Sequence, residues 1–410
     1  MGIYEELGVT PVVNATGVFT RLGGSLMPPE VIEAMVEASR QFVCIEELQQ
    51  AASRVIAEVV GTEAGYVCSG CYAGIVLSIA ACITGLDPAK MNRLPKTEGM
   101  KNEVVMEKAH RNTYDHAVEV AGGKIVEAGL GGGSQPGELE AALTDRTAAI
   151  FFLPDRSGDI PLRTVIEIAH RHGVPVVVDA AGRLDEPSCL QSYSATGADL
   201  VVFSSGKWMA GPQAAGIIAG PSRLISAIAL QHLDVDVTAD MWTVPRELVP
   251  VEKLPFIPRQ GIGRGFKVGK EEIVGAIVAL RLFANKDHGK QREIWADRLH
   301  RIVDNLGDVP HIQAEFLAAG VWRRGVPHAR IRIDEEGLGM TCSQFVNKLH
   351  SGKPPIHPHE REVSEGNLII NPWGLVGDAP EVIVRRIKEI VAETQRKPLS
   401  GSYCHHSPEL

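Results

Sequence analysis

Seven short apolar runs divide the chain between Ala51 and Gly220. The runs are AGYVCSG, NEVVMEK, KIVEAG, AAIFFLP, PVVVDAAG, ADLVVFSSG and AAGIIAG. Several are rich in β-branched residues and are apolar at both odd and even positions. This is the pattern of strands that are buried on both faces of a mostly parallel sheet. Segments with helical spacing, such as ELEAALTD and LRTVIEIAHRHG, lie between them. The alternation predicts a doubly wound α/β layer.

The pattern changes in a Pro- and Gly-rich passage from Val244 to Gly265. The apolar spacing of KVGKEEIVGAIVALRLFANKD then predicts a long connecting helix. Further helical segments (DRLHRIVDNL, CSQFVNKLH, PEVIVRRIKEIVAET) mix with short strands (ARIRID, NLIINP). We therefore expect an N-terminal arm and helix at 1–50, a large domain at 51–265, a connecting helix and small C-terminal α/β domain at 266–395, and a poorly ordered tail at 396–410.

Composition narrows the class of protein. The formal net charge is −9 over 410 residues, and an acidic balance argues against a general nucleic-acid binder. The seven cysteines are odd in number and scattered, and the first residues, MGIYEELGVTPVV, lack the marks of a secretory signal. The longest apolar run, IVLSIAACITG, is too short to cross a bilayer. We expect a cytoplasmic protein with reduced thiols, no membrane segment and no nucleic-acid partner.

Cys68 and Cys71 form a C-x-x-C pair. A zinc ribbon needs a second pair, and the sequence has none at a fitting distance, so we expect no metal site. A redox pair at the start of a helix stays open as an alternative.

The most informative segment is ADLVVFSSGKWMAGPQAAGIIAG. A strand ends at Phe203, and a Gly-rich loop that carries Lys207 leads into the next strand. A lysine in such a loop can reach the cleft at the carboxyl edge of a parallel sheet, where open α/β sheets bind ligands. Its amine can form a Schiff base with a carbonyl cofactor. On this segment alone, a solvated surface lysine is the competing interpretation.

VPVVVDAAGR ends a second apolar strand in Asp179. A pyridine nitrogen stays protonated when an ionised carboxylate lies beside it, and that charge makes the ring an electron sink. Asp179 and Lys207 at neighbouring strand ends would supply the two groups that pyridoxal phosphate needs. A helix N-cap or a metal ligand is the alternative for Asp179.

Two further segments suggest cofactor contacts. In YVCSGCYAGIVLSIAACITG a strand runs into a Ser-Gly turn and a helix, whose N-terminal amides, with Ser69, suit a phosphate. Ser204 could donate its hydroxyl to the same phosphate. In EVVMEKAHRNTYDHAV, His110 follows a strand and could stack on the pyridine ring, although a structural histidine is the alternative. His116 keeps the structural interpretation.

The order of these segments resembles fold-type I pyridoxal-phosphate enzymes, and within them the bacterial selenocysteine synthase (L-seryl-tRNA selenium transferase) branch. NATGVFTRLGGSLMPPEVIEAM, GIGRGFKVGKEEIVGAIVAL and LIINPWGL extend the resemblance across nearly the whole chain. It implies an aspartate-aminotransferase-like large domain with a mostly parallel seven-stranded sheet, a smaller C-terminal α/β domain, pyridoxal 5'-phosphate as cofactor, and a homodimer or larger homo-oligomer. It also implies Lys207 as the Schiff-base lysine, Asp179 as the pyridinium partner, and a phosphate cradle of Ser69, Gly70, Cys71 and Ser204.

The chain also departs from selenocysteine synthase. It begins directly at the NATG segment instead of with an extra tRNA-holding domain, its lysine loop reads SSGKWMAGPQ, and it is acidic overall. These differences favour the small-molecule relatives over tRNA as substrate. AHRNTYDHA and NPWGL most resemble the D-glucosaminate-6-phosphate ammonia-lyases.

This resemblance implies a lyase of the ammonia-lyase type. We expect α,β-elimination from a small 2-amino-3-hydroxy acid, such as an amino-sugar acid phosphate, giving a 2-oxo acid and ammonia, with Lys207 as the base. An amino-acid racemase or aldolase, and selenium or sulfur transfer to an aminoacyl-tRNA, are the alternatives among enzymes. Outside the enzymes, the alternatives are a cofactor-binding protein without turnover and a folded interaction module.

The substrate carboxylate calls for arginine, whose planar fork pairs both oxygens. The candidates are Arg21, Arg183, Arg264 and Arg361. Arg264 lies in a Gly-rich loop that could face the cofactor of a partner subunit, and Lys267 would join it there.

Overall fold

The computed structural model describes residues 2–130, 133–154, 160–184, 186–238, 241–318 and 325–395. Its contacts divide the chain into two compact units. The larger runs from Gly23 to Lys286, and the smaller combines the described residues on either side of it. The tail expected at 396–410 lies outside the described ranges.

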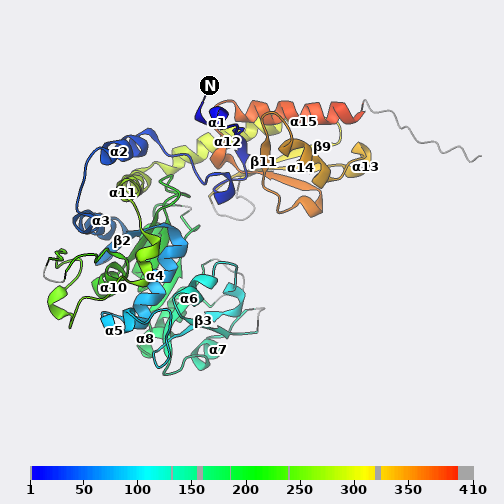
Figure 1. Cartoon of the computed structure of the whole chain (residues 1–410). Helices are drawn as coiled ribbons and strands as arrows, with labels where there is room; N and C mark the ends of the chain where they lie inside the picture. Colours follow the sequence, from blue (N-terminus) through cyan, green and yellow to red (C-terminus); the bar gives the residue numbers. More distant parts are fainter. Residues whose placement is uncertain are drawn as a thin grey trace, which may run out of the picture. The chain divides into compact units, whose positions relative to one another are not determined.

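A seven-stranded sheet forms the centre of the larger unit within the described residues (Figure 1). The strands are β2 (Ala64–Cys68), β3 (Glu103–Glu107), β4 (Lys124–Ala128), β5 (Thr147–Phe152), β6 (Val176–Asp179), β7 (Leu200–Ser204) and β8 (Gly216–Gly220). Their spatial order is β2-β8-β7-β6-β5-β3-β4. These are the seven runs that the apolar pattern predicts, and the mostly parallel sheet is confirmed.

The direction of β8 was not predicted. It runs antiparallel to both of its neighbours, β2 and β7, whereas β7, β6, β5, β3 and β4 are parallel to one another. Residues 205–215 link β7 to β8, and so short a link cannot carry the crossover that a parallel return needs. The chain therefore turns back directly after the carboxyl end of β7, and Lys207 lies in this turn.

Helix α4 (Gly70–Thr84) packs against β5, β6, β7 and β8, and α10 (Ser222–His232) packs against α4. Most of α4 is buried, as expected for a helix that is apolar nearly all round. Gly74 permits its close approach to the sheet, because an added Cβ would lie 2.6 Å from Val202 Cγ1. The start of α4 is thereby held at the end of β2.

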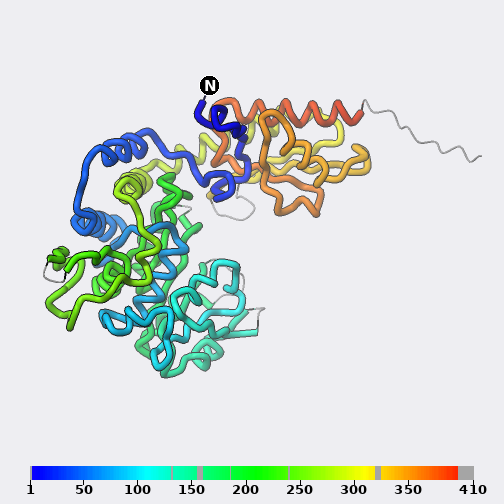
Figure 2. The backbone as a smooth tube through the Cα atoms, in the orientation of Figure 1, coloured from blue at the N-terminus to red at the C-terminus, as the bar shows by residue number. Residues whose placement is uncertain are grey.

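Three longer helices of the larger unit come before or after the strands of the sheet in the chain. They are α2 (Pro29–Ser39), α3 (Ile45–Val60) and α11 (Lys270–Asn285). Figure 2 shows α2 and α11, far apart in sequence, side by side, and α11 also packs against α3. The connecting helix expected after residue 265 is thus part of the larger unit, and the observed division falls after Lys286.

Short helices complete the larger unit. They are α5 (Pro88–Met91), η2 (Lys108–His110), α6 (His116–Val120), α7 (Pro136–Ala141), α8 (Leu162–Arg171), α9 (Cys189–Thr196), η3 (Val251–Lys253) and η4 (Ile262–Phe266).

The smaller unit has its own core. An antiparallel sheet of order β12-β10-β9 is formed by β9 (Ile312–Leu317), β10 (His328–Ile333) and β12 (Asn367–Ile370). Its helices are α1 (Ile3–Glu6), η1 (Thr20–Leu22), α12 (His288–Leu306), α13 (Glu335–Leu338), α14 (Cys342–His350), η5 (Val363–Glu365), η6 (Pro372–Gly374) and α15 (Ala379–Gln395). A parallel pair joins β1 (Val13–Ala15) to β11 (Ile356–Pro358). In neither unit does a described helix combine the length and the apolar character needed to cross a membrane.

Candidate active site

Asp179 and Lys207 lie at the same edge of the sheet. β6 and β7 are parallel neighbours, and their register pairs Asp179 with Val202. Lys207 follows three residues after the last residue of β7. The Lys207 charge acts on Asp179, where it lowers the carboxyl pKa against the effect of burial. The structure therefore brings together the two residues that the sequence singles out most strongly.

Asp179 is a buried carboxylate with a raised pKa. The residue is 7% exposed, and burial raises the pKa of its carboxyl. The Ala181 amide donates to Oδ1 over 2.9 Å, and this bond, with the charges of Lys207 and Arg183, opposes the rise. A buried anion whose pKa is still raised would be stabilised by one more cation beside it. The pyridinium nitrogen of pyridoxal phosphate is such a cation, so Asp179 fits this cofactor.

The loop that carries Lys207 is ordered by its own backbone. Gly211 N donates to Ser205 O over 2.9 Å, and Ala210 N donates to Lys207 O over 3.0 Å. Ala210 takes a left-handed conformation, with φ of 54°, to close this turn. The Ser25 hydroxyl donates to Gly206 O over 3.1 Å. Lys207 thus extends from a fixed turn, which suits a residue that must meet a bound group at one position.

The start of α4 forms the next part of the site. Gly70 has φ of +87°, and an added Cβ on Gly216 would lie 2.6 Å from the Gly70 carbonyl carbon. Glycine at 216 therefore lets β8 pass close to the first turn of α4, and glycine at 70 allows the positive φ with which the helix begins. The amides of this first turn have no partner within the helix, because a helix leaves its first donors unpaired. They form a cradle that fits a phosphate.

Cys71 joins the same cluster. Burial raises the pKa of its thiol well above the ordinary value, and the charge of Asp179 raises it further. Lys207 and a hydrogen bond with Ser204 act in the opposite direction. Cys71, Asp179, Ser204 and Lys207 are thus close enough to affect one another. Cys68 precedes them in β2, and burial raises the pKa of its thiol to about 12; neither cysteine is in a disulfide.

Ser69 is engaged with the protein itself. Its hydroxyl donates to the carbonyl oxygen of Phe266 over 2.6 Å. Its hydroxyl proton is therefore committed to Phe266 and is not available to a phosphate in this arrangement. The role of Ser69 in the phosphate cradle stays a prediction.

His110 is fully buried at the end of η2. Its Nδ1 accepts from the Leu153 amide over 3.4 Å, and its Nε2 lies 3.8 Å from Glu107 Oε1. The ring meets Phe152 edge-on, with centroids 4.9 Å apart. These contacts hold the imidazole in one orientation, and its stacking on a pyridine ring stays a prediction. His116, by contrast, is exposed and lies 3.9 Å from Glu119.

The predicted arginines separate into two groups. Arg183 lies near Asp179, on whose pKa its charge acts. Arg264 Nη2 donates to Asp234 Oδ2 over 2.7 Å, and Lys267 just after η4 is exposed. Two belong to the smaller unit, where Arg21 Nη2 donates to Glu360 over 3.1 Å and Arg361 is exposed. Of the four predicted arginines, Arg183 is thus the one whose charge acts on Asp179, and its role as a substrate contact stays a prediction.

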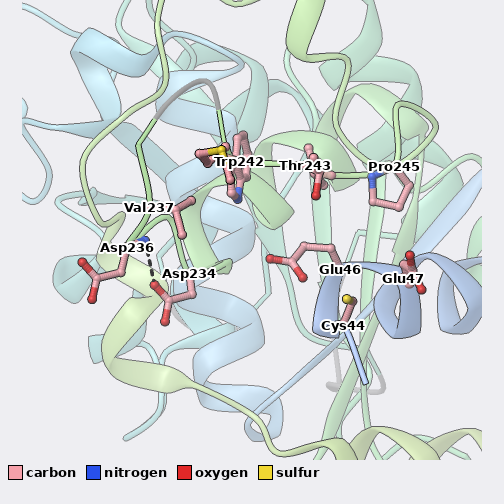
Figure 3. Close-up of a pocket in the computed structure, with 11 residues that line it drawn as sticks. Cys44, Glu46, Glu47, Asp234, Asp236, Val237, Trp242, Thr243 and Pro245 are labelled. Carbon is pink, nitrogen blue, oxygen red and sulfur yellow. Dashed lines mark hydrogen bonds between the residues drawn. The ribbon is translucent and has the colours of Figure 1, made fainter. Parts of the chain in front are cut away.

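A separate pocket of about 560 Å³ opens beside the start of α3 (Figure 3). It is lined by Cys44, Glu46, Glu47, Asp234, Asp236, Val237, Met241, Trp242, Thr243, Val244 and Pro245. Its carboxylates come from α3 and from the segment after α10, where the Asp236 amide donates to Asp234 over 3.0 Å. This lining shares no described residue with the cluster around Lys207.

One buried pair of residues in the larger unit was not predicted from the sequence. Tyr66 and His232 form a buried hydrogen-bonded pair that reaches η4. They are 166 residues apart, so no local motif could have joined them.

Known proteins resemble this chain along most of its length. The family model for class-V aminotransferases matches residues 101–235, which hold Asp179 and Lys207. A 5'-C-glycyluridine monooxygenase-decarboxylase from a Streptomyces species is 30% identical over 400 residues, which cover 95% of this chain and 92% of the relative. D-glucosaminate-6-phosphate ammonia lyase from Salmonella typhimurium is 28% identical over 400 residues, which cover 95% of this chain and 97% of the relative.

A solved structure of D-glucosaminate-6-phosphate ammonia-lyase matches the model with a TM-score of 0.82 and 28% identity, over 96% of this chain and 99% of that one. The chain is a fold-type I pyridoxal-phosphate enzyme. Its branch includes the selenocysteine synthases: L-seryl-tRNA(Sec) selenium transferase from Geotalea uraniireducens is 26% identical over 271 residues, 60% of this chain and 56% of the relative. The resemblance inferred from the sequence motifs and the inferred cofactor are confirmed.

Proposed function

We propose that this pyridoxal-phosphate enzyme is an ammonia-lyase that acts on a small 2-amino-3-hydroxy acid, such as an amino-sugar acid phosphate. The observation that carries the proposal is the pairing of Asp179 with Lys207 at adjacent strand ends, in a chain that matches D-glucosaminate-6-phosphate ammonia-lyase along nearly its full length. The reaction removes water across the α- and β-carbons, and hydrolysis of the resulting imine gives a 2-oxo acid and ammonia.

Each residue near Asp179 has a role in this proposal. When bound, pyridoxal phosphate supplies an electron sink for the α-carbon. Lys207 takes the α-proton at its amine and then returns a proton to the departing hydroxyl. Asp179 would keep the pyridine nitrogen of the bound cofactor protonated through its charge. Arg183 binds the substrate carboxylate, for which its position near Asp179 suits it.

The phosphate of the cofactor is assigned to the start of α4. We propose that the amides of Gly70 and Cys71 hold it, with the Ser204 hydroxyl beside them and Ser69 at the same turn. His110 would stack on the pyridine ring from its fixed place after β3. Arg264 and Lys267 would serve a cofactor or substrate bound by a partner subunit, which is why we assign them no role within one chain.

A second function is favoured by one specific observation. The relative at 30% identity is named a monooxygenase-decarboxylase, and its named substrate, a glycyluridine, is again an α-amino acid. Such a reaction consumes oxygen and releases carbon dioxide, whereas elimination needs no oxygen and keeps the carboxylate. Racemase, aldolase and selenium-transfer reactions use the same pairing and are further outcomes of the same assay.

An assay of the reaction products distinguishes these functions. The purified holoenzyme is incubated with D-glucosaminate 6-phosphate and with a panel of other amino-sugar acids and 3-hydroxy amino acids, with and without oxygen. We expect ammonia and a 2-oxo acid in equal amounts, at the same rate without oxygen and without tRNA. Carbon dioxide release that depends on oxygen would replace the lyase proposal with the second function.

We further propose that the enzyme is cytoplasmic and acts as a homodimer or larger homo-oligomer. Exposed apolar side chains on the larger unit support an interface between copies, among them Leu26, Phe42 and Met241. Phe42 is fully exposed in the single chain. Such a side chain would gain by burial against a second copy. Light scattering on the eluting protein tests this, and a monomer mass would contradict it.

A further inference from the structure

A buried chain of hydrogen bonds joins three elements of the larger unit. The Tyr66 hydroxyl, on β2, lies 2.9 Å from His232 Nδ1, at the end of α10. His232 Nε2 lies 2.9 Å from the carbonyl oxygen of Phe266, in η4. The Ser69 hydroxyl, at the start of α4, donates to the same oxygen over 2.6 Å. The chain therefore connects the proposed phosphate cradle with the loop that carries Arg264.

The direction of every bond follows from the Phe266 carbonyl. A carbonyl oxygen only accepts, so His232 must carry its proton on Nε2. Its Nδ1 is then an acceptor, and Tyr66 must donate to it. Burial favours this neutral form, since it lowers the pKa of His232 and raises that of Tyr66. One tautomer of His232 is consistent with both contacts.

The backbone around His232 is packed against η4 without spare room. An added Cβ on Gly261 would lie 2.4 Å from Gln231 O, and one on Gly263 would lie 2.8 Å from the same oxygen. The η4 loop thus rests directly on the last turn of α10. His232 ends that turn, so it is placed to set the position of the Phe266 carbonyl.

The carbonyl of Phe266 is next to the proposed anion site, and its partial negative charge would oppose a phosphate there. Two donors, from His232 and Ser69, occupy its two lone pairs. We propose that His232 is a positioning residue for phosphate binding: it neutralises and fixes the Phe266 carbonyl, and with it Ser69 at the start of α4. This rests on the proposed function, because it assumes that the start of α4 holds the cofactor phosphate.

Two substitutions separate this role from general packing. In His232→Gln the side-chain amide nitrogen can take the place of Nε2 and donate to Phe266. In His232→Asn the amide reaches only the place of Nδ1, so the carbonyl loses its donor. Both variants lose the aromatic ring that meets Tyr66 edge-on, with centroids 5.4 Å apart. A packing effect would therefore appear in both, whereas a positioning effect appears in His232→Asn alone.

The test measures binding by the apoprotein, with pyridoxal phosphate and with pyridoxal, which lacks the phosphate. We expect His232→Asn to weaken pyridoxal phosphate roughly fivefold to tenfold, the scale of one hydrogen bond, and to leave pyridoxal unchanged. His232→Gln should stay within about twofold of wild type for both, by the same scale. Melting temperatures of the apoproteins show whether the two variants fold equally well.

A second measurement does not depend on any variant. The ¹⁵N chemical shifts of His232 in the wild-type apoprotein should show a proton on Nε2 and none on Nδ1. The opposite tautomer, or equal losses of pyridoxal and pyridoxal phosphate in His232→Asn, would overturn the proposal. Neither readout involves ammonia release, so a failed lyase assay leaves this proposal standing, and its own failure leaves the lyase proposal intact.

Discussion

Asp179 at the carboxyl edge of β6 and the carboxylates of the pocket in Figure 3 lie in different surroundings. Asp179 is buried and lies within reach of the charges of Lys207 and Arg183. In the pocket, Asp234 is exposed and its pKa is lowered by hydrogen bonds from Gln260 and Arg264 and by nearby charge. The pocket thus holds acids that face solvent, whereas the sheet edge holds a buried carboxylate near opposite charges. The burial of a carboxylate beside opposite charges, and not the presence of an open pocket, distinguishes the proposed active site.

The largest effect should come from removing the amine at the sheet edge. Lys207→Ala should lower turnover by roughly 10³-fold or more, because one group both binds the cofactor and moves the α-proton. Steady-state ammonia release measures this. Lys101→Ala is the matched control, since Lys101 is exposed just before β3 and has no assigned role. Equal losses in the two variants would remove Lys207 from its assigned place.

The next largest effect on turnover should come from replacing the Asp179 carboxylate. Asp179→Asn keeps the shape of the side chain but not its charge, so the pyridine nitrogen would lose its proton. We expect kcat to fall on the order of 10²-fold, several kcal/mol at about 1.4 kcal/mol per decade, with the cofactor still bound. A near-normal kcat would show that another group keeps that nitrogen protonated.

Although Asp179→Asn should lower kcat, it should not lower the stability of the apoprotein at neutral pH. Folding raises the pKa of Asp179, so its contribution to stability is full below the ordinary carboxyl pKa and is lost as pH rises through the raised value. Asp179→Asn should therefore match or exceed the wild-type free energy of unfolding at neutral pH, and lose that advantage in acid. Denaturant titrations of apoprotein at several pH values test the sign.

A smaller effect is expected at the substrate carboxylate. Arg183→Gln removes one charge-assisted contact, worth roughly 1.5–3 kcal/mol, and should raise KM about tenfold or more while changing kcat less. Arg264→Gln, whose partner Asp234 is exposed, is the comparison. A KM effect confined to Arg264→Gln would move the carboxylate site to the η4 loop.

The smallest effect should come from the pocket. Glu47 is exposed on α3 and lines the opening. Glu47→Gln should change kcat/KM by no more than about twofold, since surface substitutions are usually within about 0.5 kcal/mol. A large loss in this variant would end the contrast between the two regions.

The apolar pattern of the sequence predicted the strands of the central sheet and the positions of two candidate site residues. The seven runs were sufficient to find every strand of the central sheet within the described residues, because burial on both faces leaves a strong signal. Asp179 and Lys207 were found because each follows such a run. Contacts between distant segments left no such signal: the Tyr66–His232 pair and the Arg264–Asp234 bond depend on how α10 and η4 pack. Strand direction at β8 likewise depends on link length.

Lys207 is the residue proposed to carry the cofactor. Borohydride reduction of the holoenzyme, digestion and mass spectrometry would locate the pyridoxyl group on one peptide. We expect the label on Lys207 and the loss of the protein's yellow colour on reduction. A label on Lys267 or Lys270 would contradict the assignment of the site to the edge of β6 and β7.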